Sequence, residues 1–250
     1  DVDPGLIETI RCDLGTDEVT EIVSRTHPEV VVHFAAESHV TRSETQEEVF
    51  MRTNVEGTRR ILEAASVAGV ERFVHISTDE VYGPCLEGAF AEDEKAPGPG
   101  HATSPYARSK ALADDLARTF GDRVPVSVIR PTNCFGEWQH PEKAIARWIT
   151  RALRGERLPV WGDGQQTREW MHVRDACAGI ELVATKGESG ETYNLGPGPT
   201  DVPNVEIARM VLDELAKQGA EPGIPVVLGG IVPDDDVPKL RALGIRDVFT

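Results

Sequence analysis

The sequence predicts an α/β fold with a doubly wound parallel sheet, and two observations carry this prediction. Short apolar runs recur along the chain as strand candidates, and amphipathic stretches of helical length lie between them. Because alternating strands and helices are joined by right-handed crossovers, the strands are expected to run parallel in one sheet. At 250 residues the chain is long enough to bury a core in such a fold.

In the first half of the chain the expected elements follow one another in strict alternation. The apolar run 28–36 ends in small residues and is typical of a central parallel strand. A helix is expected over 53–68, where apolar residues recur at helical spacing. The next elements are a buried strand over 71–77, a helix over 104–118 and a strand over 125–130.

The second half predicts a smaller set of elements. Strand candidates at 155–161 and 170–173 flank the polar segment 162–166, which we interpret as a hairpin turn. A helix over 175–184 and a strand over 190–196 come next. The segment 223–245 indicates a buried strand, a Gly-Gly turn and a short amphipathic helix.

Composition and charge argue against several classes of function. With 42 acidic and 26 basic residues, the net charge of −16 argues against nucleic-acid binding, which needs a basic surface. No run of about 18 apolar residues predicts a membrane span. The seven histidines lack the spacing of metal ligands, so no metal site is expected. Four cysteines without a CxxC pair favour reduced thiols and a cytoplasmic location, namely Cys12, Cys85, Cys134 and Cys177.

The residues that carry chemistry lie in two short segments. Asp79 and Glu80 follow the strand over 71–77, at the end where parallel sheets bind their ligands. Tyr106 and Lys110 are four residues apart on a predicted helix and therefore share one face. A lysine ammonium beside a phenol is expected to lower the tyrosine pKa and make it a usable base. The structural alternative is that the two acids cap a turn and the tyrosine packs in a core.

These segments resemble a known family. The Tyr106/Lys110 pair looks like the YxxxK signature of extended short-chain dehydrogenases/reductases, and Thr78–Gly83 is similar to the active-site motif of dTDP-glucose 4,6-dehydratase. Epimerases of that superfamily usually carry small hydroxyl residues where this chain has two acids. The resemblance implies a Rossmann-like, NAD-dependent enzyme whose catalytic residues are Thr78, Asp79, Glu80, Tyr106 and Lys110.

By the same resemblance, further positions are expected to bind the cofactor or the substrate. The expected NAD contacts, besides Tyr106 and Lys110, are Asp13, Leu14, Phe34, Ala35, Ala36, Asn54 and Ser77. The expected contacts to the sugar and diphosphate are Ser38, His39, Asn133, Glu142, Lys143, Arg168 and Asn194. From the residues alone, Asn54 is equally well explained as a structural bridge between strands, and Arg168 has the alternative of a surface charge.

Two regions depart from that family. No strand with a glycine-rich turn opening a helix precedes residue 30, so we expect a fragment that lacks the N-terminal β-α-β unit and binds NAD poorly. The tail resembles the end of the cobalamin-binding domain of methylmalonyl-CoA mutase, without its cobalamin-ligating histidine motif. We therefore expect a truncated NAD-binding core at 1–135, a small substrate-binding part at 136–218 and a foreign tail at 219–250.

Three functions remain open at this point. The first is dehydration of a nucleotide-activated hexose by a cytoplasmic homodimer, with either dTDP or UDP as the nucleotide. The second is 4-epimerisation or decarboxylation of a UDP-sugar, which needs neither of the two acids. The third is a non-catalytic, truncated or fused remnant.

Overall fold

The computed structural model describes residues 4–85, 88–92, 102–198, 202–219, 226–229 and 247–249. Within these ranges the chain divides into two compact units. The first unit comprises Asp1–Pro131 and Cys177–Leu195, and the second comprises Thr132–Ala176 and Gly196–Thr250. The chain therefore leaves the first unit after Pro131 and returns to it for one helix and one strand. The three-part division at 135 and 218 stays a prediction.

The first unit is built on a four-stranded parallel sheet with the order β1-β2-β3-β7. Its strands are β1 (Val30–His33), β2 (Arg72–Ile76), β3 (Val126–Pro131) and β7 (Thr192–Leu195). Its helical elements are η1 (Pro4–Leu6), α1 (Glu18–Thr26), α2 (Val40–Ser43), α3 (Glu47–Phe50), the π-helical η2 (Met51–Glu56), α4 (Gly57–Ala68), the 3-10 turn η3 (Asp79–Tyr82), α5 (Pro105–Thr119) and α7 (Val173–Lys186). The predicted doubly wound parallel sheet is confirmed.

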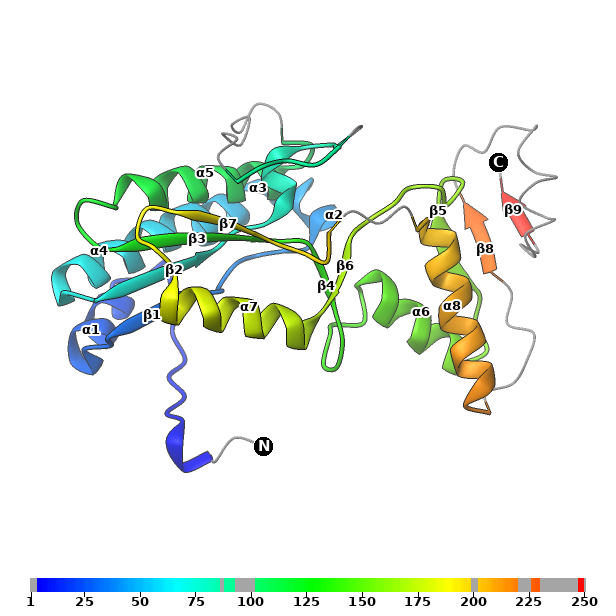
Figure 1. Cartoon of the computed structure of the whole chain (residues 1–250), viewed down its shortest axis with the longest axis horizontal. Helices are drawn as coiled ribbons and strands as arrows, with labels where there is room; N and C mark the ends of the chain where they lie inside the picture. The colour runs from blue at the N-terminus through cyan, green and yellow to red at the C-terminus, as the bar shows by residue number, and fades with distance from the viewer. Residues whose placement is uncertain are drawn as a thin grey trace. The chain divides into compact units, whose positions relative to one another are not determined.

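Helices cover both faces of this sheet, as Figure 1 shows. Successive residues of a strand point to opposite faces, and the two core clusters follow this alternation. Phe73 of β2 packs with residues of α4 and α5, whereas its neighbour Val74 packs with Ile180 and Val183 of α7. The strand over 71–77 is apolar without alternation because both of its sides are buried.

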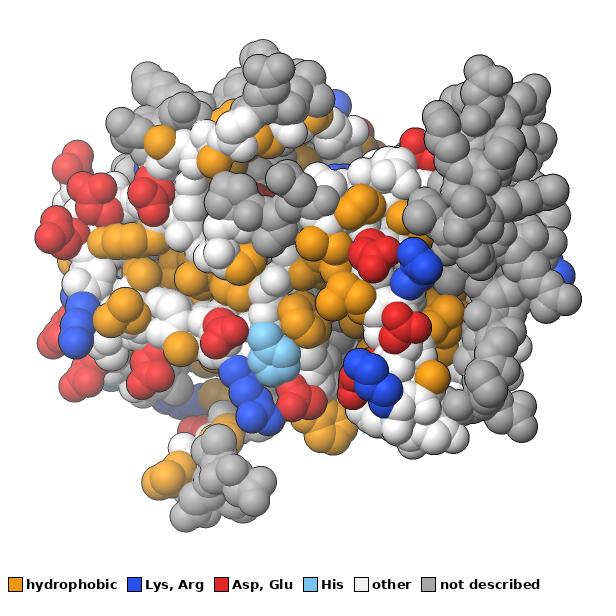
Figure 2. Space-filling view, turned by 45° about the vertical axis from the view of Figure 1, so that its right-hand side comes forward, with side chains coloured by type: hydrophobic (Ala, Val, Ile, Leu, Met, Phe, Trp, Pro, Cys, Tyr) orange, Lys and Arg blue, Asp and Glu red, His pale blue; other side chains and the backbone are white. Residues whose placement is uncertain are grey.

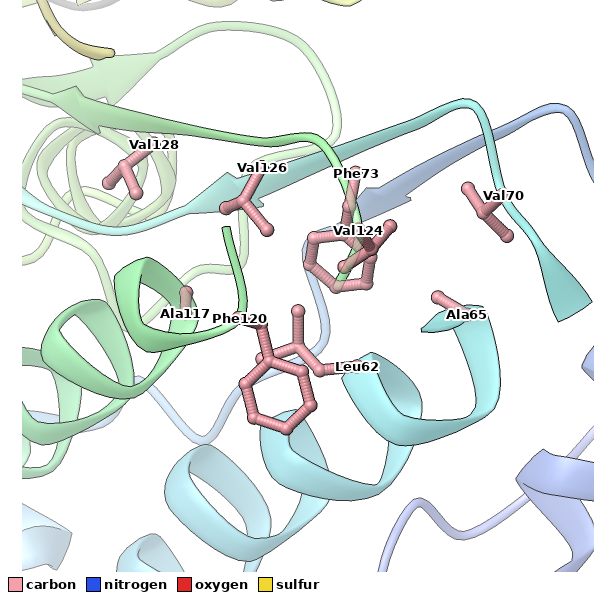
Figure 3. Packing of buried hydrophobic residues seen from close by; sticks show 9 residues of the cluster. All are labelled: Leu62, Ala65, Val70, Phe73, Ala117, Phe120, Val124, Val126 and Val128. Carbon is pink, nitrogen blue, oxygen red and sulfur yellow. The ribbon is translucent and has the colours of Figure 1, made fainter. Parts of the chain in front are cut away.

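The cluster beneath α4 and α5 is drawn in Figure 3. Leu62 and Phe73 are fully buried there, where helix and sheet meet. The full cluster comprises Leu62, Ala65, Val70, Phe73, Ala117, Phe120, Val124, Val126 and Val128. Small alanines on the helices let the β-branched residues of the strands approach closely, so the packing holds α5 firmly against the sheet.

Local signals in the sequence explain where α4 and α5 begin and end. The hydroxyl of Ser104 accepts a 3.0 Å hydrogen bond from the amide of Ala107, and Pro105 stands at the first helical position. Helix α4 ends at Gly69, whose φ of 69° is a left-handed conformation that glycine adopts without strain. The predicted helix over 104–118 therefore agrees with the structure to within one residue at each end.

The second unit contains short strands and two longer helices. Strands β4 (Asn133–Phe135) and β6 (Trp170–His172) pair in parallel, and β5 (Leu158–Trp161) belongs to a parallel sheet with β8 (Val226–Gly229) and β9 (Asp247–Phe249). Helices α6 (Ala144–Leu153) and α8 (Asn204–Lys217) were not among the sequence expectations. They form a core with β5 that comprises Trp148, Ala152, Leu158, Val160, Val205 and Ala208.

One expectation for this unit is wrong. The segment 162–166 does not form a hairpin, because β5 and β6 pair with different strands rather than with each other. Gly162 and Gly164 do adopt positive φ angles of 59° and 72°, so the chain turns there without a pairing of the flanking strands. In the tail, β8 matches the strand predicted within 223–233. The predicted helix near Asp236–Leu240 lies outside the described residues.

Two surface properties bear on function. In the part of the chain that the structure describes, no helix combines the length and apolarity needed to cross a bilayer. On the face drawn in Figure 2, most basic side chains of the described residues lie beside acidic ones and do not gather in a basic stripe.

Candidate active site

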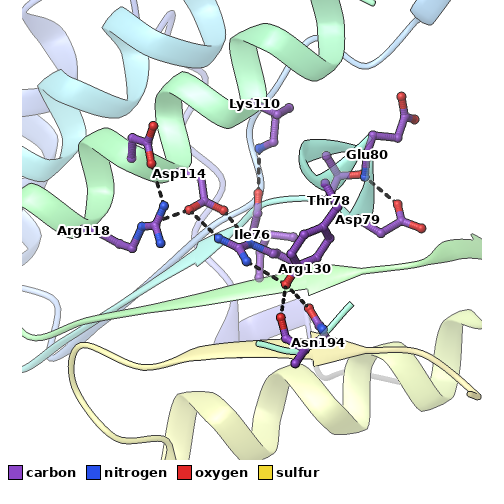
Figure 4. Close-up of polar contacts among 12 residues, drawn as sticks. Ile76, Thr78, Asp79, Glu80, Lys110, Asp114, Arg118, Arg130 and Asn194 are labelled. Carbon is purple, nitrogen blue, oxygen red and sulfur yellow. Dashed lines mark hydrogen bonds and ion pairs between the residues drawn. The ribbon is translucent and has the colours of Figure 1, made fainter. Parts of the chain in front are cut away.

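The candidate site begins where β2 ends, with the sequence Ser77–Thr78 leading into η3. Thr78 is the N-cap of this turn, and its hydroxyl accepts a 3.3 Å hydrogen bond from the amide of Glu80. The same hydroxyl lies 3.2 Å from the Oδ1 atom of Asp79 and donates to it. Figure 4 shows both acids on this turn, at the carboxyl end of the strand. The predicted position of the acid pair is therefore confirmed.

Tyr106 lies in the first turn of α5 and joins the acid pair. Its ring meets that of Phe50 edge-on, with the centroids 6.4 Å apart. Burial raises the pKa of Tyr106 above its ordinary value, and the carboxylates of Glu80 and then Asp79 raise it further. Both carboxylates thus lie within electrostatic reach of the Tyr106 hydroxyl and disfavour its phenolate form.

Lys110 shares the buried part of α5 but does not act on Tyr106 as expected. Its Nζ atom donates a 2.6 Å hydrogen bond to the carbonyl oxygen of Ile76, as drawn in Figure 4. Burial lowers the pKa of Lys110 to about 8, against the opposing effect of Asp114. The expectation that Lys110 lowers the pKa of Tyr106 is wrong for this structure, because burial and the two carboxylates dominate that hydroxyl.

The end of β2 also presents an unsatisfied polar atom. Ser77 is buried, and its hydroxyl makes no hydrogen bond with the described part of the chain. It follows Ile76, whose carbonyl oxygen holds the ammonium of Lys110. A buried hydroxyl without a partner is costly unless a ligand satisfies it. Ser77, Tyr106 and Lys110 thus fit the hydroxyl-rich nicotinamide ribose that the resemblance implies.

The loop after β1 supplies the next group of predicted residues. Phe34 and Ala35 are exposed, and Ala36 is half-buried. Ser38 is exposed, and the Nδ1 atom of His39 accepts a hydrogen bond of 3.2 Å from the amide of Arg42 at the start of α2. Contacts of these residues with a cofactor or a sugar stay predictions.

Asn54 fixes this loop in place. Its Oδ1 atom accepts a 2.7 Å hydrogen bond from the amide of Glu37, and its Nδ2 atom donates to the carbonyl oxygen of Glu37 at 3.0 Å and the hydroxyl of Ser109 at 2.8 Å. Asn54 is therefore a structural bridge, as one of the two expectations had it, but the elements that it joins differ from those expected. It bridges the loop after β1 to α5 rather than two strands.

The expected adenine contacts, Asp13 and Leu14, lie before α1. Asp13 accepts a 2.8 Å hydrogen bond from the amide of Gly15 and forms a 2.6 Å ion pair with Arg52. Leu14 packs against the cluster that contains Val19 of α1. Their contact with a nucleotide stays a prediction.

Four of the expected substrate contacts lie in the second unit. Asn133 begins β4, and Lys143 is the N-cap residue of α6. The amide of Glu142 donates a 3.4 Å hydrogen bond to His140. Arg168 is exposed, and its guanidinium donates to the carbonyl oxygen of Thr167 at 2.7 Å. Both explanations of Arg168, phosphate partner and surface charge, remain open.

Sequence reasoning missed a buried polar network behind the acid turn. Arg130 of β3 and Asp114 of α5 form a bidentate ion pair, with distances of 3.0 and 3.1 Å. Arg130 also donates to the hydroxyl of Tyr82 at 2.7 Å, and Tyr82 donates to Asn194 at 2.8 Å. Asn194, an expected substrate contact, is therefore engaged within the protein. The sequence did carry one indication that Asp114 is buried. It lies at helical spacing from the alanines of the buried face of α5, namely Ala107, Ala111 and Ala117.

Comparison with known proteins relates this arrangement to a family. The family model described as "NAD dependent epimerase/dehydratase family" matches residues 2–196. The low-salt glycan biosynthesis protein Agl12 of Haloferax volcanii is 43% identical over 222 residues, which are 86% of this chain and 69% of that protein. A dTDP-glucose 4,6-dehydratase of Streptomyces niveus is 44% identical over 207 residues, which are 81% of this chain and 59% of that protein.

A solved structure is similar over nearly the whole chain. DesIV, a dTDP-glucose 4,6-dehydratase from Streptomyces venezuelae crystallised with NAD and TYD bound, has a TM-score of 0.80 and 37% sequence identity. The match covers 99% of this chain and 76% of that one.

Proposed function

The chain belongs to the NAD dependent epimerase/dehydratase family, and on this premise we propose that its activity is the dehydration of a nucleotide-activated hexose. The reaction is of the type that takes dTDP-glucose to dTDP-4-keto-6-deoxyglucose with NAD as cofactor. The observation that carries the proposal is the acid turn, where Asp79 and Glu80 open η3 directly after β2, at the strand end that also holds the ammonium of Lys110.

Each step of this reaction has a candidate residue at the site. NAD, when bound, supplies a hydride acceptor and donor. Tyr106 takes the proton of the C4 hydroxyl, and Thr78, the N-cap of the acid turn, holds the oxygen that becomes the 4-keto group. The keto group acidifies the C5 proton, which Glu80 removes. Asp79 then protonates the departing C6 hydroxyl, which leaves as water, and Glu80 returns its proton to C5 as C6 is reduced.

The local geometry supports the two opposite duties of the acids. The side chain of Asp79 accepts a 3.2 Å hydrogen bond from the hydroxyl of Thr78, whereas Glu80 contacts that hydroxyl through its backbone amide. The acids thus stand in different surroundings although they are neighbours in sequence. Different surroundings are how a site keeps one carboxyl protonated and the other ionised.

The two alternative functions explain the residues of the site less well than dehydration does. A 4-epimerase or decarboxylase acting on UDP-sugars has no use for a C5 base or a C6 acid, so it leaves the acid turn unexplained. A non-catalytic remnant leaves unexplained why the unsatisfied hydroxyl of Ser77, the buried ammonium of Lys110 and Tyr106 converge at one strand end.

The remaining proposals concern the setting of the enzyme. The cofactor contacts are Asp13, Leu14, Phe34, Ala35, Ala36, Asn54, Ser77, Tyr106 and Lys110, and the substrate contacts are Ser38, His39, Asn133, Glu142, Lys143, Arg168 and Asn194. A cytoplasmic location is supported by the four cysteines, which are all free. A homodimer is our expectation from the sequence, and sedimentation analysis tests it.

Product analysis tests the proposed reaction. The protein is incubated with excess NAD and either dTDP-glucose or UDP-glucose carrying deuterium at C4. Dehydration predicts a product that has lost water and carries deuterium at C6, because the hydride returns there. A product of unchanged mass with inverted C4 would establish the epimerase instead. No turnover of either sugar would support the remnant.

A further inference from the structure

Directly behind the acid turn lies an ion pair that is sealed from solvent. The side chains of Arg130 and Asp114 are both fully buried, and they join β3 to α5 by two parallel hydrogen bonds. Arg118 reaches the same carboxylate from the next turn of α5, at 3.3 Å. Neither Arg130 nor Asp114 has a part in the reaction steps assigned above.

Tyr82 connects this pair to the acid turn. It is the last residue of η3, which begins with Asp79 and Glu80. Its hydroxyl accepts from Arg130 and donates to Asn194 of β7, and the guanidinium lies 4.7 Å from the centre of its ring. The dashed lines of Figure 4 follow this path from Asp114 to Asn194. The ring of Phe90 stacks on that of Tyr82, with centroids 4.8 Å apart.

The hydrogen bonds within the backbone of the turn are long. The amide of Val81 reaches the carbonyl oxygen of Thr78 at 3.4 Å, and the amide of Gly83 reaches that of Glu80 at 3.2 Å. The N-cap bond from Thr78 is 3.3 Å long. These distances lie at or beyond the usual limit for an N–H···O bond, so the backbone alone holds the two acids weakly. The much shorter bonds of Tyr82 fix the end of the turn instead.

A buried ion pair is a costly way to stabilise a fold. Taking two charges out of water offsets much of their attraction, and apolar residues of similar volume often serve stability as well or better. What apolar residues cannot supply is a directed donor for the hydroxyl of Tyr82. The ion pair is therefore better explained by its effect on geometry, because it holds the guanidinium of Arg130 where it donates to Tyr82.

We propose that Arg130, Asp114 and Tyr82 are positioning residues that hold the acid turn in register with Tyr106. This inference rests on the proposed dehydration. Since Asp114 and Tyr106 belong to the same helix, the network couples the turn that bears the C5 base and C6 acid to the helix that bears the C4 base. Loss of the network should impair proton transfer at C5 and C6 more than oxidation at C4.

The variant Tyr82→Phe tests this with a single atom, and Tyr193→Phe is its matched control. Tyr193 lies next to Asn194 on β7, but its hydroxyl accepts from the amide of Glu188, away from the turn. In Tyr82→Phe, exchange of the C5 proton with solvent and loss of water should slow about 10- to 100-fold, with KM changed less than about threefold. Formation of reduced cofactor in a single turnover should change less than about threefold, and Tyr193→Phe should match the parent.

A double variant separates positioning from stability. Arg130→Met/Asp114→Leu replaces the ion pair by apolar groups, so the melting temperature should be kept or raised while the C5 and water-loss rates fall as in Tyr82→Phe. Hydrogen exchange at the amides of Val81 and Gly83 should quicken about tenfold in both variants and not in Tyr193→Phe.

The outcomes distinguish this inference from the proposed reaction. If the parent protein dehydrates no nucleotide hexose, the proposed function fails. The rates of amide hydrogen exchange at Val81 and Gly83 then show by themselves whether the network holds the acid turn. If exchange and rates in Tyr82→Phe equal those of Tyr193→Phe, the network does not position the turn. Equal loss of C4 oxidation and water loss would also overturn the inference.

Discussion

The ammonium of Lys110 donates a 2.6 Å hydrogen bond to the carbonyl oxygen of Ile76 and so joins α5 to the carboxyl end of β2. Lys110 is only 4% exposed, and burial lowers its pKa to about 8. A buried ammonium is an unfavourable element of a folded core. It persists at the strand end that bears the candidate site, which indicates that it serves the site rather than the fold.

Replacement of this lysine should therefore stabilise the protein and inactivate it. In Lys110→Met the free energy of unfolding at pH 7 should rise by about 1–3 kcal/mol, because no charge is buried. Between pH 8 and 10.5 the unfolded parent binds more protons at Lys110 than the folded one, so parental stability rises with pH across that window. The gain in Lys110→Met should accordingly fade toward pH 10.5.

Thermal unfolding followed by circular dichroism from pH 6 to 10.5 measures this effect. Lys217→Met, at an exposed position of α8, is the control and should stay within about 0.5 kcal/mol of the parent. A destabilised Lys110→Met at pH 7 would show that the bond to Ile76 outweighs the burial of the charge.

The acid pair should be needed for water loss and not for oxidation. In Glu80→Gln and Asp79→Asn, loss of water should slow about 10²- to 10⁴-fold, as expected when a general base or acid is removed. Oxidation at C4 should remain partly intact, because neither acid transfers a proton in that step of the proposed reaction. Rapid-quench mass analysis measures the product, and cofactor absorbance reports the oxidation. Parental dehydration rates in both variants would remove the pair from the mechanism.

Tyr106→Phe should abolish both oxidation and dehydration. Without the hydroxyl no group accepts the proton of the C4 hydroxyl, so no later step can begin. The ring contact with Phe50 is retained, so the fold should be preserved. Absorbance of reduced cofactor in a single turnover is the measurement, and Tyr193→Phe is the control. Substantial oxidation by Tyr106→Phe would point to another base.

Two buried histidines should make the first unit sensitive to acid. Burial lowers the pKa of His33 to about 3 and that of His75 well below its ordinary value, with Lys110 adding to both effects. Below pH 6.5 the two histidines bind protons in the unfolded chain but stay neutral in the folded chain. The free energy of unfolding therefore falls as the pH falls. Each histidine should cost about 1.4 kcal/mol per pH unit below that point, until its folded pKa is reached.

The variant His75→Leu isolates half of this effect. Both ring nitrogens of His75 are buried without hydrogen-bond partners among the described residues, so leucine removes the titration without breaking a bond. Its melting temperature should fall less between pH 7 and pH 5 than that of the parent. His140→Gln, at an exposed position, should behave like the parent. Identical acid sensitivity of His75→Leu and parent would contradict the assignment.

Residues 1–250 by themselves should bind NAD weakly. Pyrophosphate binding in doubly wound folds relies on backbone amides at a helix N-terminus that is reached through glycines. The sequence contains no G-x-G-x-x-G or G-x-x-G-x-x-G run. Calorimetric titration with NAD should show binding weaker than micromolar, and stoichiometric micromolar binding would reveal a phosphate site in another segment.

The sequence by itself determined the fold class and the positions of the acid pair. Apolar runs at 28–36, 71–77 and 125–130 could only be buried on both sides, and this requires a parallel sheet covered by helices. The acids follow one of these runs directly, so their place at the strand end was set by chain connectivity alone.

Only the tertiary structure decided how these groups are charged and held. The spacing of Tyr106 and Lys110 correctly placed them on one helix, but the pKa of Tyr106 depends on burial and on Glu80, which is distant in sequence. The network of Arg130, Asp114 and Tyr82 joins residues up to 48 positions apart. Such effects arise from distances in space and from exclusion of water, which local sequence patterns do not encode.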